Sequence, residues 1–123
     1  MRLGKGWLLF IGVLIAIWAC SSFSALAVAV PQDQVIQIKA KKFEYMPNEI
    51  TLKKGVPVVL ELTSLDRLHG FNCPAFGIRG DVQPNKITKI RFTPNKVGTF
   101  EFHCDNFCGS GHGNMTGKFI VTE

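Results

Sequence analysis

The sequence predicts an all-β fold, a sandwich of two sheets, for residues 31–123. Apolar and polar residues alternate in several short runs, and this is the period of a half-buried strand. Gly, Pro and Asn separate the runs at short intervals, as is typical of β-sandwiches. This part of the sequence shows no 3.6-residue period of useful length, so we expect no major helix.

The first half of this domain contains three of the expected strands. Residues 35–40 alternate apolar with polar side chains, and residues 49–52 form a brief strand that ends at a Lys-Lys-Gly turn. Residues 56–63 are apolar and β-branched, as expected of a central strand. Pro57 should lie near the start of that strand, because proline cannot donate a ladder hydrogen bond.

The second half adds three strands and one long connection. Residues 86–92 and 99–104 alternate, and the alternation turns Cys104 toward the interior. Residues 117–121 form the closing strand. Residues 64–85 are too many, and too rich in Gly and Pro, for a hairpin turn. We therefore expect a long functional loop there.

Residues 1–30 have the features of a targeting segment. Arg2 and Lys5 precede an almost wholly apolar stretch from Trp7 to Cys20, and Ala25-Leu26-Ala27 offers a cleavage site. The apolar stretch is shorter than the ~20 residues of a spanning helix, so we expect a cleaved signal peptide. An uncleaved N-terminal membrane anchor and a lipid anchor on Cys20 are the alternatives. In all three cases we expect an exported protein, in the periplasm or on the outer face of the cytoplasmic membrane.

The charge balance excludes some partners. Of the 14 Lys and Arg residues, two lie in the targeting segment, so 12 remain against 9 Asp and Glu, a net charge of +3. These basic residues are scattered along the chain, and this argues against nucleic-acid binding. A modest electrostatic preference for an acidic partner is compatible with the balance.

Four soft or borderline metal ligands lie within twelve residues, in the pattern Cys-x3-Cys-x3-His-x2-Met: Cys104, Cys108, His112 and Met115. Thiolate and thioether ligands favour copper(I), zinc or iron–sulfur clusters, and imidazole suits copper and zinc. Zinc sites use Cys, His and carboxylate ligands, whereas a weak axial Met is typical of electron-transfer copper. His69 supplies a second imidazole, so the pattern predicts a copper site.

The spacing alone leaves the number of copper ions open. One Cys, two His and one Met would form a mononuclear blue-copper site, and Cys104 would then have no role. Two thiolates can instead bridge two copper ions that share one redox electron. A Cys104–Cys108 disulfide is a further alternative, but it leaves the regular positions of His112 and Met115 unexplained.

Other side chains near the ligands have less certain roles. We interpret Cys73 as a core thiol rather than a ligand. His103 is interpreted as a surface or supporting residue, because strand alternation turns it away from the interior. Three aromatic residues flank the ligands in sequence, and they form either a docking patch for a partner or packing under the loops: Phe71, Phe76 and Phe107.

The ligand pattern resembles that of the copper-binding domain of cytochrome c oxidase subunit II, which carries the binuclear CuA centre, also found in nitrous-oxide reductase. The family pattern is a His in one loop and Cys-x-Glu-x-Cys-x3-His-x2-Met in another. The stretches Ala40–Tyr45, Thr63–His69 and Pro74–Asp81 are also similar to the family. The resemblance implies a cupredoxin, a Greek-key β-sandwich.

The resemblance also implies roles for individual residues. Two thiolates bridge two copper ions, one imidazole binds each ion, and a thioether and a backbone carbonyl are weak ligands. In that order these are Cys104 and Cys108, His69 and His112, Met115, and the carbonyl of Asn106. The family has Glu where this chain has Asn106, and that Glu serves a magnesium site between oxidase subunits. The paired transmembrane helices of subunit II also have no counterpart here, so a free-standing domain is expected.

The expected function is electron transfer, to or from a redox partner such as a c-type cytochrome or a terminal oxidase or reductase. We expect no catalytic activity, because protein ligands fill the expected metal positions and leave no open site for a substrate. The alternatives are a copper chaperone or storage protein for an oxidase or reductase, a mononuclear blue or red copper carrier, and a detached subunit of a respiratory enzyme.

Overall fold

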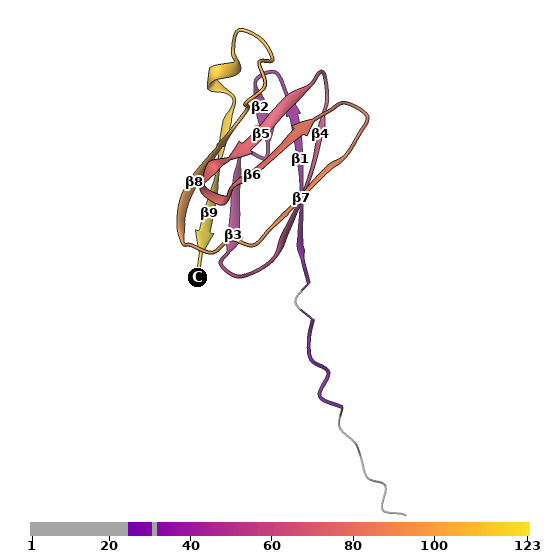
Figure 1. Cartoon of the computed structure of the whole chain (residues 1–123), viewed down its shortest axis with the longest axis vertical. Coiled ribbons are helices and arrows are strands. Elements are labelled where there is room, and N and C mark those ends of the chain that lie inside the picture. Colours follow the sequence, from indigo (N-terminus) through magenta and orange to yellow (C-terminus); the bar gives the residue numbers. More distant parts are fainter. Residues whose placement is uncertain (1–24, 31) are drawn as a thin grey trace, which may run out of the picture.

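The computed structural model describes residues 25–30 and 32–123, which fold into two packed β-sheets (Figure 1). The expected β-sandwich is confirmed. The first sheet has four strands, in the order β2 (Glu44–Met46), β1 (Gln34–Lys41), β4 (Val58–Ser64) and β7 (Thr88–Phe92). The second has five, in the order β3 (Glu49–Lys53), β9 (Thr116–Thr122), β8 (Gly98–His103), β5 (His69–Cys73) and β6 (Ile78–Val82).

Two of the ladders are parallel and join strands that are distant in sequence. β1 pairs in parallel with β4, and β3 pairs in parallel with β9, whereas the other pairs are antiparallel. The alternation read from the sequence holds in β1, where Ile38 and Ala40 are buried and Lys39 is exposed. Pro57 precedes β4, so the missing N–H interrupts no ladder within that strand.

The expectation of a long loop at residues 64–85 is wrong. This segment contributes β5 and β6, which pair antiparallel in the second sheet. A single 3₁₀ turn, η1 (Pro74–Phe76), joins them, and Gly77 closes it with a φ of 63°. Glycine adopts this left-handed conformation at little cost, so the Gly and Pro of the segment build a tight turn. The three-residue strand β2 was also not predicted.

Four aromatic rings form the centre of the core beneath the predicted ligands. Tyr45 comes from the first sheet, and Phe71, Phe102 and Phe119 come from the second. Phe102 lies 4.8–5.3 Å, centroid to centroid, from each of the other three rings. All four side chains are fully buried or nearly so. Because the rings join both sheets, they give the metal-binding end of the molecule a rigid base.

The three phenylalanines flanking the ligands do not form one patch. Phe71 is fully buried, so the docking interpretation is wrong for that residue. Phe76 is half-buried and packs against Phe92 and Phe100. Only Phe107 of the three is exposed, with 72% of its surface accessible.

The two ends of the sandwich differ in what they carry. Figure 1 shows the connection between β8 and β9 at one end, and the segment leading into β1 together with the C terminus at the other. The interpretation of residues 1–30 as a targeting segment falls almost entirely outside the described residues. Within residues 25–30 and 32–123, no helix has the length and apolar character needed to cross a membrane.

Candidate metal centre

Strand register brings the two ligand-bearing segments together. Asn72 of β5 pairs with His103 of β8, and these strands run antiparallel. The chain beyond His103 therefore passes back along β5 toward His69. The backbone N–H of Gly70 donates to Cys104 Sγ at 3.3 Å, which links the two segments directly.

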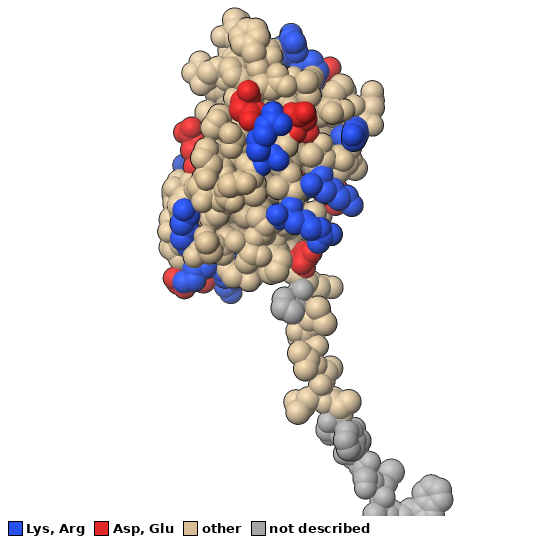
Figure 2. Space-filling model, viewed as in Figure 1, with Lys and Arg blue, Asp and Glu red and all other residues tan. Residues whose placement is uncertain are grey.

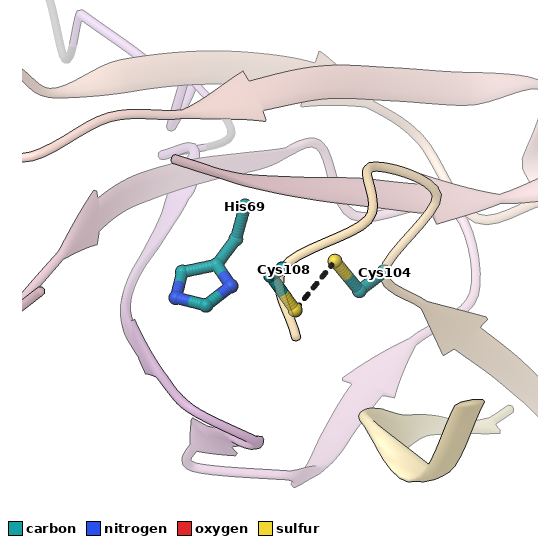
Figure 3. Close-up of side chains that lie close together, drawn as sticks. All are labelled: His69, Cys104 and Cys108. Carbon is teal, nitrogen blue, oxygen red and sulfur yellow. Dashed lines mark hydrogen bonds between the residues drawn. The ribbon is translucent and has the colours of Figure 1, made fainter. Parts of the chain in front are cut away.

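Six predicted ligands gather at this point. Candidate ligand atoms of His69, Cys104 and Cys108, all buried, lie within 4.8 Å of one another (Figure 3). The two sulfurs are 3.8 Å apart. Cys108 Sγ lies 3.6 Å from His112 Nδ1 and 3.8 Å from Met115 Sδ. Cys104 Sγ lies 3.1 Å from the backbone oxygen of Asn106, so the structure brings the whole predicted set together.

The cysteines of the cluster are free thiols. A disulfide requires about 2.05 Å between sulfurs, whereas Cys104 Sγ and Cys108 Sγ are 3.8 Å apart. Burial, together with the neighbouring Cys104, raises the pKa of the Cys108 thiol to about 11. A bound cation would reverse this preference, because a metal ion favours the thiolate.

Backbone hydrogen bonds shape the ligand loop, which we define as residues 104–115. The 3₁₀ turn η2 (His112–Asn114) reverses the chain just before β9. Cys104 N–H donates to Met115 O at 3.1 Å, and Met115 N–H donates to His112 O at 3.1 Å. The first of these bonds closes the loop at its base, so the ligands at both of its ends face the same point.

The two nitrogens of His69 have different surroundings. Nε2 lies 2.6 Å from Asp66 Oδ1, whereas Nδ1 is buried without a hydrogen-bond partner among the described residues. Figure 3 shows one ring nitrogen facing the two sulfurs. When Nε2–H donates to the carboxylate, Nδ1 carries the free lone pair. An unpaired buried nitrogen is costly, so a soft metal at this position fits the donor set.

Asp66 is itself held in place by hydrogen bonds. Partial burial alone would raise the pKa of its carboxyl group, but donors from Lys42 N–H, His69 and Arg67 N–H outweigh burial and hold the pKa below its ordinary value. The carboxylate is therefore charged at neutral pH, as a partner of His69 Nε2–H should be. The ligand pattern in the sequence did not include Asp66, although an acid three positions before a candidate ligand was a signal.

A second supporting contact comes from Tyr45. Its hydroxyl donates to the backbone oxygen of Gly70 at 2.5 Å, next to His69. Burial, and then the nearby Cys104 and Asp105, raise the pKa of Tyr45 well above its ordinary value, so the hydroxyl keeps its proton. This hydrogen bond holds the backbone of Gly70, the residue whose own N–H donates to Cys104 Sγ.

The two other residues discussed from the sequence are not among the clustered ligand atoms. Cys73 belongs to the hydrophobic core, as expected, and burial raises the pKa of its thiol. His103 is partly exposed and pairs with Thr116 and Asn72 across the sheet. In the face that Figure 2 presents, Lys and Arg side chains are interspersed with Asp and Glu.

The comparison with known families decides the classification. A family model described as a cupredoxin-like domain matches residues 10–121. The chain belongs to the cupredoxin-like domain family. Its two-sheet architecture is the sandwich that the resemblance implied.

Two similar proteins show which cupredoxin-like domains this chain is related to. Cytochrome c oxidase subunit 2 of Thermus thermophilus is 33% identical over 93 residues, covering 76% of this chain and 69% of that protein. A second Thermus thermophilus subunit 2 is also 33% identical over 93 residues, and this chain spans 55% of its length. This cupredoxin-like domain is therefore homologous to the copper domains of oxidase subunit II.

A solved structure shares the fold. The periplasmic domain of cytochrome oxidase subunit II from Bradyrhizobium japonicum superposes with a TM-score of 0.70 and 24% identity, covering 76% of this chain and 88% of that one. The homology and the His/Cys/Cys cluster together support copper binding and a role in electron transfer.

Proposed function

We propose that this cupredoxin-like domain is an exported electron carrier with a binuclear CuA-like copper centre. The observation that supports it most directly is the pair of buried thiols, 3.8 Å apart, faced by His69 Nδ1, which has no hydrogen-bond partner in the described part of the chain. A mononuclear site would leave Cys104 without a role, although its sulfur lies inside the cluster.

In this proposal the ligands fall into three chemical types. Two thiolates and two imidazoles would be the main ligands of the two ions, and a thioether and a carbonyl would be weak ligands. The residues are Cys104 and Cys108, His69 and His112, and Met115 with the backbone carbonyl of Asn106. Asn106 is suited to this role even though it replaces an acidic residue of the family pattern, because its contact uses the main chain.

The protein's contribution is to fix and bury these ligands. Bound copper supplies a one-electron couple, with the charge shared between two ions. The loop hydrogen bonds, the Asp66–His69 contact and the aromatic base hold the donor atoms in position. A buried, rigid ligand set needs little rearrangement when an electron arrives, and this favours rapid transfer.

The relatives also support a proposal about the compartment and the partner proteins. The relatives are named as oxidase subunits, and one is a periplasmic domain. We infer an exported location and a redox partner such as a c-type cytochrome or a terminal oxidase or reductase. The exposed Phe107 ring lies 5.7 Å from the His112 ring, so a partner touching it would be close to a ligand.

Copper stoichiometry and electron paramagnetic resonance test the proposal. The copper-loaded full chain should hold two coppers and give a signal in which one unpaired electron couples to two copper nuclei. Cys104→Ser should abolish that signal. One copper per chain, with hyperfine coupling to one nucleus, would contradict the binuclear centre.

The chaperone alternative needs a separate measurement. A carrier retains its copper while it is reduced and reoxidised through repeated cycles. A chaperone instead gives up copper(I) readily to an acceptor and cycles weakly. Copper content after repeated redox cycling, measured in the presence of a copper(I) chelator, separates the two roles.

A further inference from the structure

Arg79 connects the ligand loop to the neighbouring hairpin. Its Nε donates to Asp105 Oδ2 at 2.7 Å and its Nη2 donates to Asp105 Oδ1 at 3.0 Å. Its Nη1 lies 2.6 Å from Asp81 Oδ1. Arg79 and Asp81 belong to β6, whereas Asp105 directly follows the predicted ligand Cys104. We call Arg79, Asp81 and Asp105 the Arg79 clasp.

The clasp crosses β5 at Gly70, where a side chain would block it. A Cβ on Gly70 would lie 1.9 Å from Asp105 Oδ1 and 3.0 Å from Asn106 N. The absence of a side chain at Gly70 therefore lets the Asp105 carboxylate lie directly over β5. The same glycine donates its N–H to Cys104 Sγ. The clasp therefore contacts β5 beside the first residue of the ligand loop.

The geometry of the clasp distinguishes it from an ordinary surface ion pair. Exposed ion pairs typically contribute little to stability. Here the guanidinium binds one carboxylate with two nitrogens and a second carboxylate with the third. The Asp105 side chain is 21% exposed, whereas the Arg79 and Asp81 side chains are each 46% exposed, so the two-point geometry and not burial sets this contact apart. Two-point binding of this kind is stronger and more directional than a single contact. Asp105, and then Asp81, raise the pKa of Arg79 above its ordinary value, so it stays charged.

We propose that Arg79 is a positioning residue for the metal centre, holding the ligand loop closed over Cys104 and Cys108 and slowing the release of copper. Nothing in the ligand pattern assigns this role, because Arg79 lies 25 positions before Cys104. The inference about copper release rests on the proposed function. The inference about loop closure does not, because loop closure is a property of the metal-free chain.

Thiol alkylation of the metal-free full chain tests loop closure. Iodoacetamide labelling, resolved by mass spectrometry of peptides, reports each cysteine separately. In Arg79→Gln, Cys104 and Cys108 should label about fivefold faster, because a network ion pair contributes on the order of 1 kcal/mol. Loss of a positive charge by itself would lower the thiolate fraction and slow labelling, so faster labelling reports opening of the loop.

The chain provides its own controls for this experiment. Cys73 is buried in the core away from the loop, so its labelling rate reports global unfolding and should not change. Arg91→Gln is a matched variant, because Arg91 pairs with Asp33 at 2.6 Å in the other sheet. The cysteines of Arg91→Gln should label at the wild-type rates. Arg79→Lys keeps the positive charge but loses the two-nitrogen contact with Asp105. The labelling rates of Cys104 and Cys108 in this variant should therefore lie between those of Arg79→Gln and the wild type.

Copper release gives a second, independent readout. Copper-loaded Arg79→Gln should lose copper to a copper(I) chelator about fivefold faster than Arg91→Gln. Equal labelling of Cys104 and Cys108 in Arg79→Gln and the wild type would overturn the proposal, as would parallel acceleration at Cys73. If Arg79→Gln fails to fold, Asp105→Asn is the replacement variant. A chain that binds no copper would refute the proposed function, while labelling would still decide loop closure.

Discussion

At the scale of single residues, His69 shows how a buried polar side chain is prepared for a ligand. One nitrogen is occupied by Asp66 at 2.6 Å, and the other has no partner among the described residues. Burying a ring with one unpaired nitrogen costs free energy, and metal binding would offset that cost. The carboxylate thus selects which nitrogen is available.

Removing the Asp66 carboxylate tests this arrangement. Asp66→Ala should lower copper affinity about 10–100-fold, the usual effect of losing an outer partner of a metal-binding histidine. Competition with a chelator of known affinity measures the change. Asp66→Asn keeps an acceptor for Nε2–H and should lose less.

The control for this variant is another surface acid. Asp33→Ala breaks the ion pair with Arg91, far from the ligands in the fold, and should leave copper affinity unchanged. Because Asp66 also accepts from Lys42 and Arg67, the unfolding free energy of each metal-free variant should be measured alongside. Equal copper affinity in Asp66→Ala and the wild type would show that the carboxylate does not orient the ring.

At the scale of elements, the ligand loop depends on contact with the segment between β1 and β2. The ring of Phe43 lies against Gly109 and Gly111, and a Cβ on Gly111 would come within 2.4–2.8 Å of its carbons. The half-buried ring supports the loop from outside, and the glycines give it room to approach. Loop position is therefore set partly by a residue about 60–70 positions earlier in the chain.

A pair of glycine substitutions tests this contact. Gly111→Ala should destabilise the protein by about 1–3 kcal/mol, the typical cost of overpacking, and weaken copper binding, because the loop must shift away from Phe43. Gly113→Ala is the matched control, since a Cβ there would meet no other described segment of the chain within 4 Å. Urea unfolding and copper titration of both variants would measure the effects. Equal stability of the two variants would show that the loop does not rest on Phe43.

Local sequence predicted the ligand loop better than its surroundings. Spacing identified Cys104, Cys108, His112 and Met115 because all four lie in one short segment. The β5–β6 hairpin was missed, because the left-handed conformation of Gly77 makes a compact turn that resembles a loop in sequence. Arg79 could not be found at all, because its contact with Asp105 depends on strand register in the folded sheet.

At the scale of the whole molecule, the predicted metal centre is continuous with the core, because Cys104, Cys108 and Met115 belong to the same buried cluster as the aromatic rings. The rings of Tyr45, Phe71, Phe102 and Phe119, which form the aromatic base, join the two sheets without using any donor atom of the predicted site. The ligands come from β5 and from the ligand loop, so a bound metal would connect two segments already supported by the sandwich. The fold therefore has its own source of stability, dominated by apolar burial.

Because the ring–ring contacts between the sheets use no ligand atom, they predict how the protein responds to copper removal. The metal-free chain should remain folded, because the core is complete without the metal. Its melting temperature should be about 10–20 °C lower, since free copper at 100 times its Kd adds about 2.7 kcal/mol to stability and each kcal/mol shifts the melting temperature of a small domain by about 4–8 °C. Thermal unfolding followed by circular dichroism, before and after chelation, measures the difference.

Cys108→Ser should melt at the same temperature with and without copper, because this sulfur contacts both Cys104 and Met115. Loss of the β signal on chelation would instead mean that the metal, and not the aromatic base, holds the two sheets together.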